Sequence, residues 1–564
     1  LKAGGQQPVE FQIEISEVGE LETIWTAEAN ADASVTDSVQ STLQSLPAVG
    51  ARRAVKFARL NGQSNNLMND MDPVVTEGNG ELTVTLSNSR LTELGEAVDQ
   101  LLHYPYGCLE QSSSSLLPWI ILKKHRDLFP SFAKSDEEMR RAIDHGINRI
   151  LSMQLPNGAM AYWPGEHEPF LWGTAYAGMI LYLAKEHGSD VPQQRLERLA
   201  AWLHKSLRDS EAHRDRASGS GFILYTLALL GEPDSGYEQK WLDQSHLLTL
   251  EDATFLAMAL SRNEGQKENA KKLLNGLANR KENATSWYGP TQLAPLRLLA
   301  WLALDSKSSE VDRLVTELVS SKRAGHWHTT QGNAWSLLAL TAYARVVESD
   351  IGAAAGTLTI GGASHSFSLD GANPIKTFRV PYIGAAQRPQ VDVLVQGESK
   401  VFLQLKLETR PIRSETVRQE NGITVQRTYQ KITVDGKKLP VTDLAVGDLV
   451  EVRLDLQTDR PAHFVVVDDA LPSLFEPVNP ALKSHRPLHA APIPGWSTSH
   501  QEFRRDRALF FCDHLSAGQH KITYLARVRA AGNAAAPATK AEEMYRPERF
   551  GTSASANLRA IPLP

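Results

Sequence analysis

Cys108 and Gln111 are the two residues of this chain whose types and spacing most clearly suggest chemistry. They lie three positions apart, directly after Gly107 and before a serine-rich and then apolar run. If Cys108 opens a helix, this spacing places both side chains on one face of its first turn. The helix N-terminus would then lower the pKa of the thiol and favour the nucleophilic thiolate. Held beside the glutamine amide carbon, that sulfur could displace ammonia and leave an internal thioester, because intramolecular attack is far faster than a bimolecular reaction.

The same cysteine has two less reactive interpretations. A buried cysteine often acts only as a small hydrophobic side chain. The chain holds two cysteines, and Cys108 could instead form a disulfide with Cys512 if the two meet in an oxidising compartment. The spacing by itself leaves these alternatives open.

Two histidine-containing stretches are weaker candidates for chemistry. Glu166 and His167 lie in one turn, and His326 and His328 lie in another. Neither stretch has the spacing His-Glu-x-x-His that places two ligands on one helix face. We therefore predict no metal, no cofactor and no catalytic residue at either place.

The elements around the motif are expected to be helical from about residue 91 to 347. Apolar segments recur there at a spacing of roughly 40 residues, which is typical of repeated helical hairpins. A single hairpin cannot bury its apolar face, so about six pairs are expected to close into an α/α barrel. Nine of the eleven tryptophans fall in this block, where packing between repeats explains them. The helices are expected at 142–153, 174–186, 194–206, 221–230, 253–261, 271–278, 293–304, 311–321 and 330–347.

The flanking segments alternate apolar and polar residues with a period of two, which predicts strands. Such runs occur at 9–15 and 81–86 before the helices, and from about residue 351 to the end after them. Segment 36–46 is expected to form a short helix, and 530–538 a mobile loop. The predicted domains are 1–88 (β-rich), 89–350 (helical), 351–412 (return of the first β domain) and 413–564 (a β-sandwich).

The overall composition limits the classes of partner. The net charge of −6 gives no basic surface for nucleic acid. No apolar run approaches the roughly 18 residues that a membrane span needs. The chain opens at Leu1 without an initiator methionine or signal peptide, as expected of a piece cut from a longer protein.

Residues 107–111 (GCLEQ) resemble the thioester signature of the alpha-2-macroglobulin and complement superfamily. Leu109, between Cys108 and Glu110, resembles the motif of the bacterial branch. The preceding stretch 104–106 (YPY) resembles that branch as well. The resemblance continues in the tryptophan- and glycine-rich turns of the helical block and spans about residue 80 to the end. Its later parts are 464–472, 505–511 and 543–547.

The resemblance implies a fold of several α and β domains. An α/α-toroid thioester domain would be inserted in a CUB-like β domain, and a C-terminal macroglobulin-like β-sandwich would follow. It also implies that macroglobulin domains, a protease-cleaved bait region and a lipoprotein-type anchor lie upstream of this chain.

The function implied by the resemblance is that of a broad-spectrum protease inhibitor rather than an enzyme. A protease would be trapped covalently, once, when one of its lysine amines opens the Cys108–Gln111 thioester. The expected location is the periplasm of a Gram-negative bacterium, at the inner membrane through the upstream lipid anchor. Target proteases are the expected partners, with cell-wall synthesis proteins as expected neighbours.

A thioester in water needs a shield, and two side chains are expected to supply it. Tyr104 lies one helical turn before Cys108, and its ring could cover the sulfur or simply pack in the core. Met544, with the adjacent Tyr545, could close over the motif from the last domain, as the resemblance implies. His213 occupies a position somewhat like the histidine that assists acyl transfer in complement members, but a surface loop histidine is usually only solvated.

The principal alternative function is an α/α-toroid carbohydrate-active enzyme. Such an enzyme needs two opposed carboxylates at the mouth of the barrel. Glu166, Glu251 and Asp252 are the available candidates, although no motif singles them out. Fold by itself does not decide between the two functions.

Overall fold

The computed structural model describes residues 11, 13 and 19–562. Within the latter range it leaves out 30–31, 46–49, 130–131, 133–134, 210–218, 278–279, 281–292, 324, 349–351, 372, 385–387, 398, 411–416, 443 and 481–497. Of the strand expected at 9–15, only Phe11 and Ile13 are described, and His213 lies outside the described residues.

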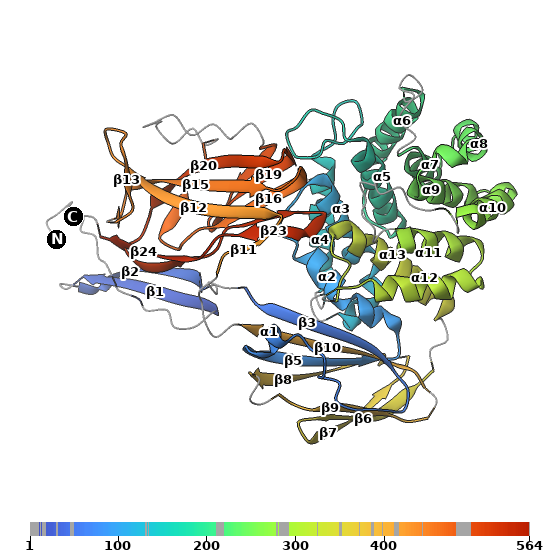
Figure 1. Ribbon diagram of the computed structural model, residues 1–564, viewed down its shortest axis with the longest axis horizontal. Helices are drawn as coiled ribbons and strands as arrows, with labels where there is room; N and C mark the ends of the chain where they lie inside the picture. Colours follow the sequence, from blue (N-terminus) through green and yellow to red (C-terminus); the bar gives the residue numbers. More distant parts are fainter. Residues whose placement is uncertain are drawn as a thin grey trace.

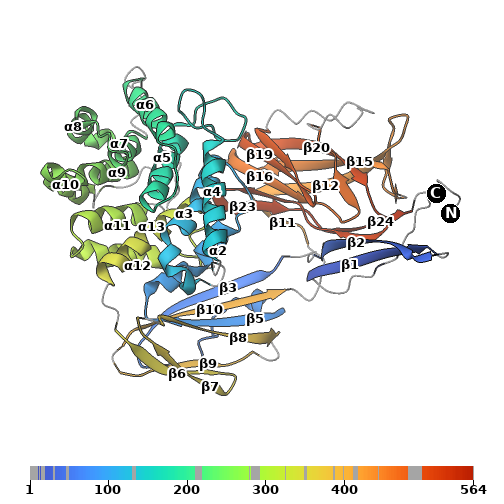
Figure 2. The same ribbon diagram turned by 180° about the vertical axis from the view of Figure 1, so that it is seen from behind.

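The helical block forms a closed ring of helix pairs, which confirms the α/α toroid (Figures 1 and 2). Each inner helix packs on the next, and the last packs back on the first. The six described inner helices are α3 (Leu109–Ile121), α5 (Leu171–Glu186), α7 (Ser220–Leu229), α9 (Leu250–Ser261), α11 (Leu293–Leu304) and α13 (Thr330–Val347). The described outer helices are α2 (Gly95–Leu102), α4 (Asp136–Leu151), α6 (Gln193–Asp209), α8 (Ser235–Asp243), α10 (Lys267–Leu277) and α12 (Ser309–Ser320).

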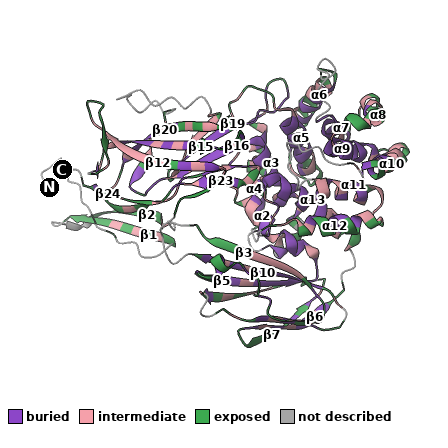
Figure 3. Ribbon diagram, viewed as in Figure 1, coloured by how far each residue is buried: buried purple, intermediate pink, exposed green. Residues whose placement is uncertain are grey.

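The sequence of each helix decides whether it is inner or outer. Helix α7 (SGFILYTLAL) is apolar nearly all round and is buried on almost every side. Helix α4 buries only Met139, Ile143, Ile147 and Ile150, the stripe that a period of 3.6 residues predicts. Figure 3 shows the inner helices as largely buried and the outer ones as exposed on one side. None of the described helices is long and apolar enough to cross a membrane.

The CUB-like domain is a sandwich of two four-stranded sheets that the toroid interrupts. Leu405 of β10 pairs with Val84 of β5 on one side and Lys56 of β3 on the other, so strands before and after the toroid share one sheet. The first sheet has the order β3 (Arg52–Leu60), β10 (Val401–Arg410), β5 (Asn79–Ser87), β8 (Ile375–Ile383). The second has the order β4 (Gln63–Ser64), β9 (Val391–Val395), β6 (Ala354–Ile360), β7 (Ala363–Leu369). Helix α1 (Pro73–Thr76) lies against the first sheet.

The C-terminal domain is a β-sandwich with its own apolar core. One sheet has the order β11 (Gln419–Asn421), β23 (Arg546–Thr552), β22 (Lys540–Glu543), β16 (Ala462–Ala470), β19 (Arg507–Leu515), β18 (His500–Phe503). The other has β13 (Lys438–Pro440), β12 (Ile423–Ile432), β15 (Leu449–Thr458), β20 (Gly518–Val528), β17 (Phe475–Pro477). A small sheet of β14 (Leu444–Ala445), β24 (Ala556–Ile561) and β21 (Gly532–Ala536) closes one side.

Two local expectations were wrong. The helix expected at 36–46 falls on strand β2 (Asp32–Ser45), which pairs antiparallel with β1 (Gly19–Ala29). The loop expected at 530–538 contains β21, which pairs with β24. In both places pairing with a partner strand outweighs a weak local pattern.

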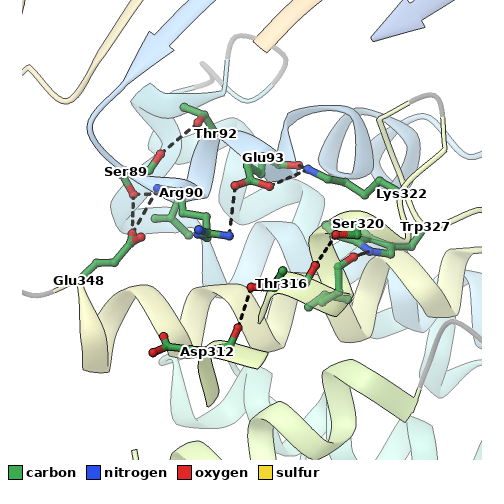
Figure 4. A network of polar contacts seen from close by, with 12 residues as sticks. Ser89, Arg90, Thr92, Glu93, Asp312, Thr316, Ser320, Lys322, Trp327 and Glu348 are labelled. Carbon is green, nitrogen blue, oxygen red and sulfur yellow. Dashed lines mark hydrogen bonds and ion pairs between the residues drawn. The ribbon is translucent and has the colours of Figure 1, made fainter. Parts of the chain in front are cut away.

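A buried ion pair joins the start of the toroid to the segment between its last two helices, α12 and α13 (Figure 4). Lys322 Nζ bonds Glu93 Oε2 at 3.0 Å, with both side chains almost fully buried. The same ammonium lies over the ring of Phe57 in β3, 3.5 Å from its centroid. Glu93 belongs to the 3₁₀ turn η1 (Arg90–Leu94), so this contact holds the toroid against the CUB-like sheet. The other described 3₁₀ turns are η2 (Lys123–Leu128), η5 (Ser245–Leu247) and η6 (Glu264–Gln266).

Candidate functional site

Cys108 is the N-cap of α3, and Gln111 is the third residue of its first turn. The Cys108 backbone N–H donates to Gln111 Oε1 at 3.3 Å, so the glutamine side chain curls back over the start of the helix. This is the capping-box arrangement, in which a glutamine at this position satisfies the N-cap amide. Both side chains are fully buried. The local sequence therefore brings the sulfur and the glutamine amide to one place.

The segment before Cys108 is held from two domains. Arg149 of α4 donates to the Gly107 carbonyl at 2.9 Å. Arg504 of the C-terminal sandwich donates to the Pro105 carbonyl at 2.6 Å. The motif thus lies where the toroid meets the sandwich.

Side chains from both domains cover the motif in one hydrophobic cluster. Gln111 Nε2 donates to the sulfur of Met544 at 3.2 Å, so this residue reaches the motif from the C-terminal sandwich. Tyr104 is partly buried at the edge of the cluster, with its ring edge-on to Tyr106 at 5.4 Å. The rest of the cluster consists of Tyr162, Trp163, Phe170, Phe464, Tyr545, Val466, Leu509 and Phe511.

Several of these covering residues were missed from sequence. Trp163 was read as packing between repeats, yet its indole stacks on His500 of the sandwich, with ring centroids 4.2 Å apart. It also meets Phe511 at 4.4 Å. Its position in a glycine- and proline-rich turn just before an inner helix was the available signal. No local pattern indicated His500 or Phe511.

Phe464 reaches the toroid through a break in strand β16. His463 and Val465 pair with His514 and Cys512 in an unchanged register, and Phe464 between them is left out of the pairing. Its φ of +51° is in the left-handed region, at a cost of about 1–3 kcal/mol for a side chain of this size. The Phe464 ring lies against Tyr162 of the toroid and against Tyr545.

Glu110 is a fully buried carboxylate beside the motif. It accepts hydrogen bonds from Ser114 at 2.6 Å, from Thr330 of α13 at 2.8 and 2.9 Å, and from Tyr545 of the sandwich at 3.0 Å. Burial raises its pKa to about 6, although these hydroxyls lower it in part. Inner helices α3 and α13 of the toroid and the C-terminal sandwich therefore all contact one ionisable group. Leu109, between Cys108 and Glu110, is fully buried in the core of the toroid.

The thiol of Cys108 is less acidic than the motif suggested. Burial raises its pKa to about 12, with the Glu110 charge adding to the effect. Bonds from the helix N-terminus and from Tyr162 lower the pKa, but by less. The expectation of a thiolate stabilised by the helix is therefore wrong for the closed arrangement, because desolvation outweighs the helix dipole.

The residues behind the disulfide and carbohydrate-enzyme interpretations have structural roles in this fold. Cys108 and Cys512 are both buried thiols without a disulfide, and Cys512 lies in the separate core of the sandwich. Asp252 accepts the backbone N–H groups of Gly219, Gly221 and Phe222 at the start of α7, so it caps a helix.

The other flagged polar groups also have structural surroundings. Glu166 accepts the Trp163 N–H at 3.1 Å within its own turn. His326 is largely buried, and burial lowers its pKa to about 4. Among the described residues, no group of three or more His, Cys, Asp or Glu side chains could hold a metal ion.

Comparison with known proteins finds matches among alpha-2-macroglobulins. Residues 82–219 match the model of the A-macroglobulin TED domain, and residues 422–548 match that of the bacterial alpha-2-macroglobulin MG10 domain. Both models describe domains of alpha-2-macroglobulins, and they match part of the toroid and most of the C-terminal sandwich. The alpha-2-macroglobulin of Escherichia coli is 25% identical over 523 residues, which cover 88% of this chain and 30% of that protein. An alpha-2-macroglobulin homolog of Nostoc is 23% identical, over 85% of this chain and 27% of that protein.

Solved structures share the fold. The native E. coli alpha-2-macroglobulin from domain MG7 to the C-terminus aligns with a TM-score of 0.78 at 21% identity, over 97% of this chain and 88% of that one. A Salmonella alpha-2-macroglobulin reacted with methylamine aligns with a TM-score of 0.78 at 23% identity, over 97% of this chain and 36% of that one. The chain thus spans about 30% of the length of the curated relatives, and its extent matches their C-terminal region.

Proposed function

We propose that this chain is the covalent trapping part of a broad-spectrum protease inhibitor, with Cys108 and Gln111 forming its thioester. The observation that carries the proposal is the N-cap geometry that folds the Gln111 side chain back to Cys108 beneath a buried hydrophobic cluster. A thioester needs both features, because proximity forms the bond and exclusion of water preserves it. The matches to domains of alpha-2-macroglobulins support the same function.

In the proposed reaction a protease lysine supplies the nucleophile. Its neutral amine attacks the Gln111 acyl carbon, the carbon–sulfur bond breaks, and an amide joins the two proteins. Cys108 leaves as a thiolate and takes up the proton that the amine loses. The chain is consumed in one such event, so it is an inhibitor and not an enzyme.

The buried motif must be uncovered before any lysine can reach it. The groups over Gln111 and Glu110 include Met544 and Tyr545, both from the C-terminal sandwich. Movement of the sandwich away from the toroid is therefore the opening step that the proposal requires.

The proposal extends to the setting of the longer protein. It acts in the periplasm of a Gram-negative bacterium, at the inner membrane through a lipid anchor upstream of this chain. Its targets are host or competitor proteases, and its neighbours include cell-wall synthesis proteins. Fractionation of cells that express the full-length protein tests this placement, and a cytoplasmic pool would contradict it.

Methylamine tests the thioester directly. Freshly purified chain should have an intact mass short by one ammonia, and methylamine should add its own mass while exposing one new thiol. Cys108→Ala should abolish both effects, whereas Cys512→Ala, the matched change at the other buried cysteine, should preserve them. An ordinary thiol at Cys108 and an intact amide at Gln111 in fresh protein would refute the proposed function.

A further inference from the structure

Two histidine rings from neighbouring strands of the C-terminal sandwich face each other. His463 in β16 and His514 in β19 are cross-strand partners near the end of the pair where β16 begins and β19 ends. Their Nδ1 atoms lie 3.4 Å apart. Their ring centroids are 4.8 Å apart, so the rings converge on the side of the two nitrogens. Both residues are exposed, so an ion in solution can reach the point between them.

The distance between the two nitrogens indicates which interaction the pair is suited to. A neutral imidazole carries a proton on one ring nitrogen and a lone pair on the other, so one histidine could donate to the other. Hydrogen bonds from N–H groups to oxygen span about 2.7–3.2 Å, so a bond over 3.4 Å between the rings is a weak one. Two nitrogens that bind one metal ion lie further apart, because the ion is larger than a shared proton.

The separation matches that of two ligands on a tetrahedral zinc ion. Zinc bonds to histidine nitrogen are about 2.0–2.1 Å long, and two such nitrogens at the tetrahedral angle lie about 3.4 Å apart. In the square-planar sites that copper and nickel prefer, neighbouring nitrogens at the same bond length would lie only about 2.9 Å apart. The distance between His463 and His514 therefore favours zinc.

The backbone on both sides of the pair is held by hydrogen bonds. Glu543 of β22 is almost fully buried and accepts the backbone N–H of His463 at 2.7 Å. Its other carboxylate oxygen accepts from Arg549 at 3.2 Å, which compensates its charge. Next to His514, the backbone N–H of Asp513 donates to Ser499 Oγ at 3.0 Å. Binding an ion between the rings therefore requires little rearrangement of the backbone.

Two other histidine sites use their nitrogens differently. His326 Nδ1 accepts the backbone N–H of His328 at 3.1 Å, so its lone pair is already occupied. His204 lies between two carboxylates, with Nδ1 3.4 Å from Asp234 and Nε2 3.8 Å from Glu232. The pair in the sandwich differs from both, because two ring nitrogens from separate strands point at one place.

We propose that His463 and His514 form an exchangeable zinc site that ties β16 to β19. The ion takes the Nδ1 lone pair of each ring, and a ring that carried its proton on Nδ1 carries it on Nε2 instead. Two protein ligands are fewer than the three or four of catalytic and structural zinc centres, so water completes the tetrahedron. The ion is therefore held weakly enough to exchange with zinc in solution.

The place of the site gives the ion a structural effect. Phe464, the residue after His463, is left out of the pairing of the two strands and has a left-handed backbone. Its ring lies against Tyr162 of the toroid. A zinc ion would join β16 to β19 directly beside this interruption. The site does not use Cys108, so it is independent of the proposed thioester.

Zinc titration of the whole chain tests the site. Isothermal titration calorimetry of wild type should show one ion bound with a dissociation constant well below millimolar. His463→Ala and His514→Ala should each weaken this binding at least about tenfold, because even an indirect partner of a metal ligand contributes that much to affinity. Both side chains are exposed, so neither change should disturb the fold.

His520→Ala is the matched control. It removes a partly exposed histidine of the same sandwich, whose Nε2 lies 2.7 Å from the Ser516 carbonyl oxygen. It should leave the zinc affinity unchanged, as should Cys108→Ala. Ions bound at other histidines are common to all the variants, so the comparison isolates the pair.

Two results of the titration would overturn the proposal. One is a wild-type affinity only in the millimolar range, as expected of single surface histidines. The other is an unchanged affinity in either His463→Ala or His514→Ala, which would place the ion elsewhere. In crystals of the chain soaked with zinc, an anomalous difference peak should lie between the two Nδ1 atoms, and the lack of a peak there would also refute the site.

Discussion

At the scale of single residues, burial controls the chemistry of the motif more than the helix terminus does. Cys108 sits at a helix N-terminus, where a thiolate is usually favoured. In the closed arrangement the surrounding aromatic cluster removes water and keeps the thiol protonated. The same cluster that makes the thiol unreactive would protect a thioester from hydrolysis. Burial therefore has both effects at this site.

Met544 should determine how long the thioester survives. Met544→Ala removes the sulfur that contacts Gln111 and opens the cover on the side of the sandwich, so water should reach the bond about tenfold faster. The thioester half-life, followed by intact mass, measures this. Met179→Ala makes a comparable cavity in inner helix α5, away from the motif, and should leave the half-life unchanged. Equal half-lives in Met544→Ala and wild type would rule out this shielding role.

At the scale of elements, the ends of helices and the breaks in strands position the site. The N-termini of α3 and α13 meet at Glu110, through its own backbone and through Thr330. Phe464, with its left-handed backbone, interrupts the pairing of β16, and its ring lies against Tyr162 of the toroid. Regular helices and strands form the scaffold, and the residues that contact the motif lie where these elements begin or are interrupted.

Asp252 should contribute more to the free energy of unfolding than an ordinary helix cap does. Asp252→Ala leaves three backbone N–H groups at the start of α7 without their acceptor, and should lower the free energy of unfolding by about 2–4 kcal/mol. Asp234→Ala removes the partly exposed cap of α8, which bonds one N–H, and should cost about 1 kcal/mol. Denaturant unfolding compares the two. Equal losses would mean that the extra bonds of Asp252 contribute nothing.

At the scale of the whole molecule, the toroid is held between two β-sandwiches of different character. Its contact with the C-terminal sandwich is an aromatic cluster around the motif. Its contact with the CUB-like sheet is more polar and includes Lys406–Glu96 at 2.9 Å and Arg53–Asp99 at 3.2 Å. A cavity of about 570 Å³ lies between that sheet and α2. The apolar contact is thus the one that the proposed function requires to open.

Lys322 should contribute strongly to the stability of the contact between the toroid and the CUB-like sheet. Lys322→Met leaves the buried Glu93 carboxylate with only its longer ion pair to Arg90, at 3.6 Å, and should destabilise the chain by about 3 kcal/mol, the low end for breaking a buried pair. Adding Glu93→Gln to it should recover much of that loss, because the poorly compensated charge is then gone. Lys271→Met, at the solvent-exposed pair with Asp305, should lower the free energy of unfolding far less. Unfolding free energies of the four proteins test this, and a double variant no more stable than Lys322→Met would contradict it.

The sequence by itself determined the local chemistry and the class of scaffold. The spacing of Cys108 and Gln111 was enough to predict one face of a helix start, because a helical turn fixes the relation of residues three apart. Apolar periodicity was enough to predict the ring, since α11 and α13 begin and end where the pattern does. Where the pattern was weak, as in β2 and β21, pairing with distant strands decided the outcome.

Only the tertiary structure decided what surrounds the motif. Glu110 and Tyr545 are 435 positions apart, and Gln111 and Met544 are 433 apart. The contacts of Tyr162 and Trp163 with the sandwich likewise depend on how two separately folded domains dock. Short-range patterns report the turn, the cap and the buried face of one element, because those depend on neighbours along the chain. The pKa of the thiol and the cover over it depend on neighbours in space, which docking alone supplies.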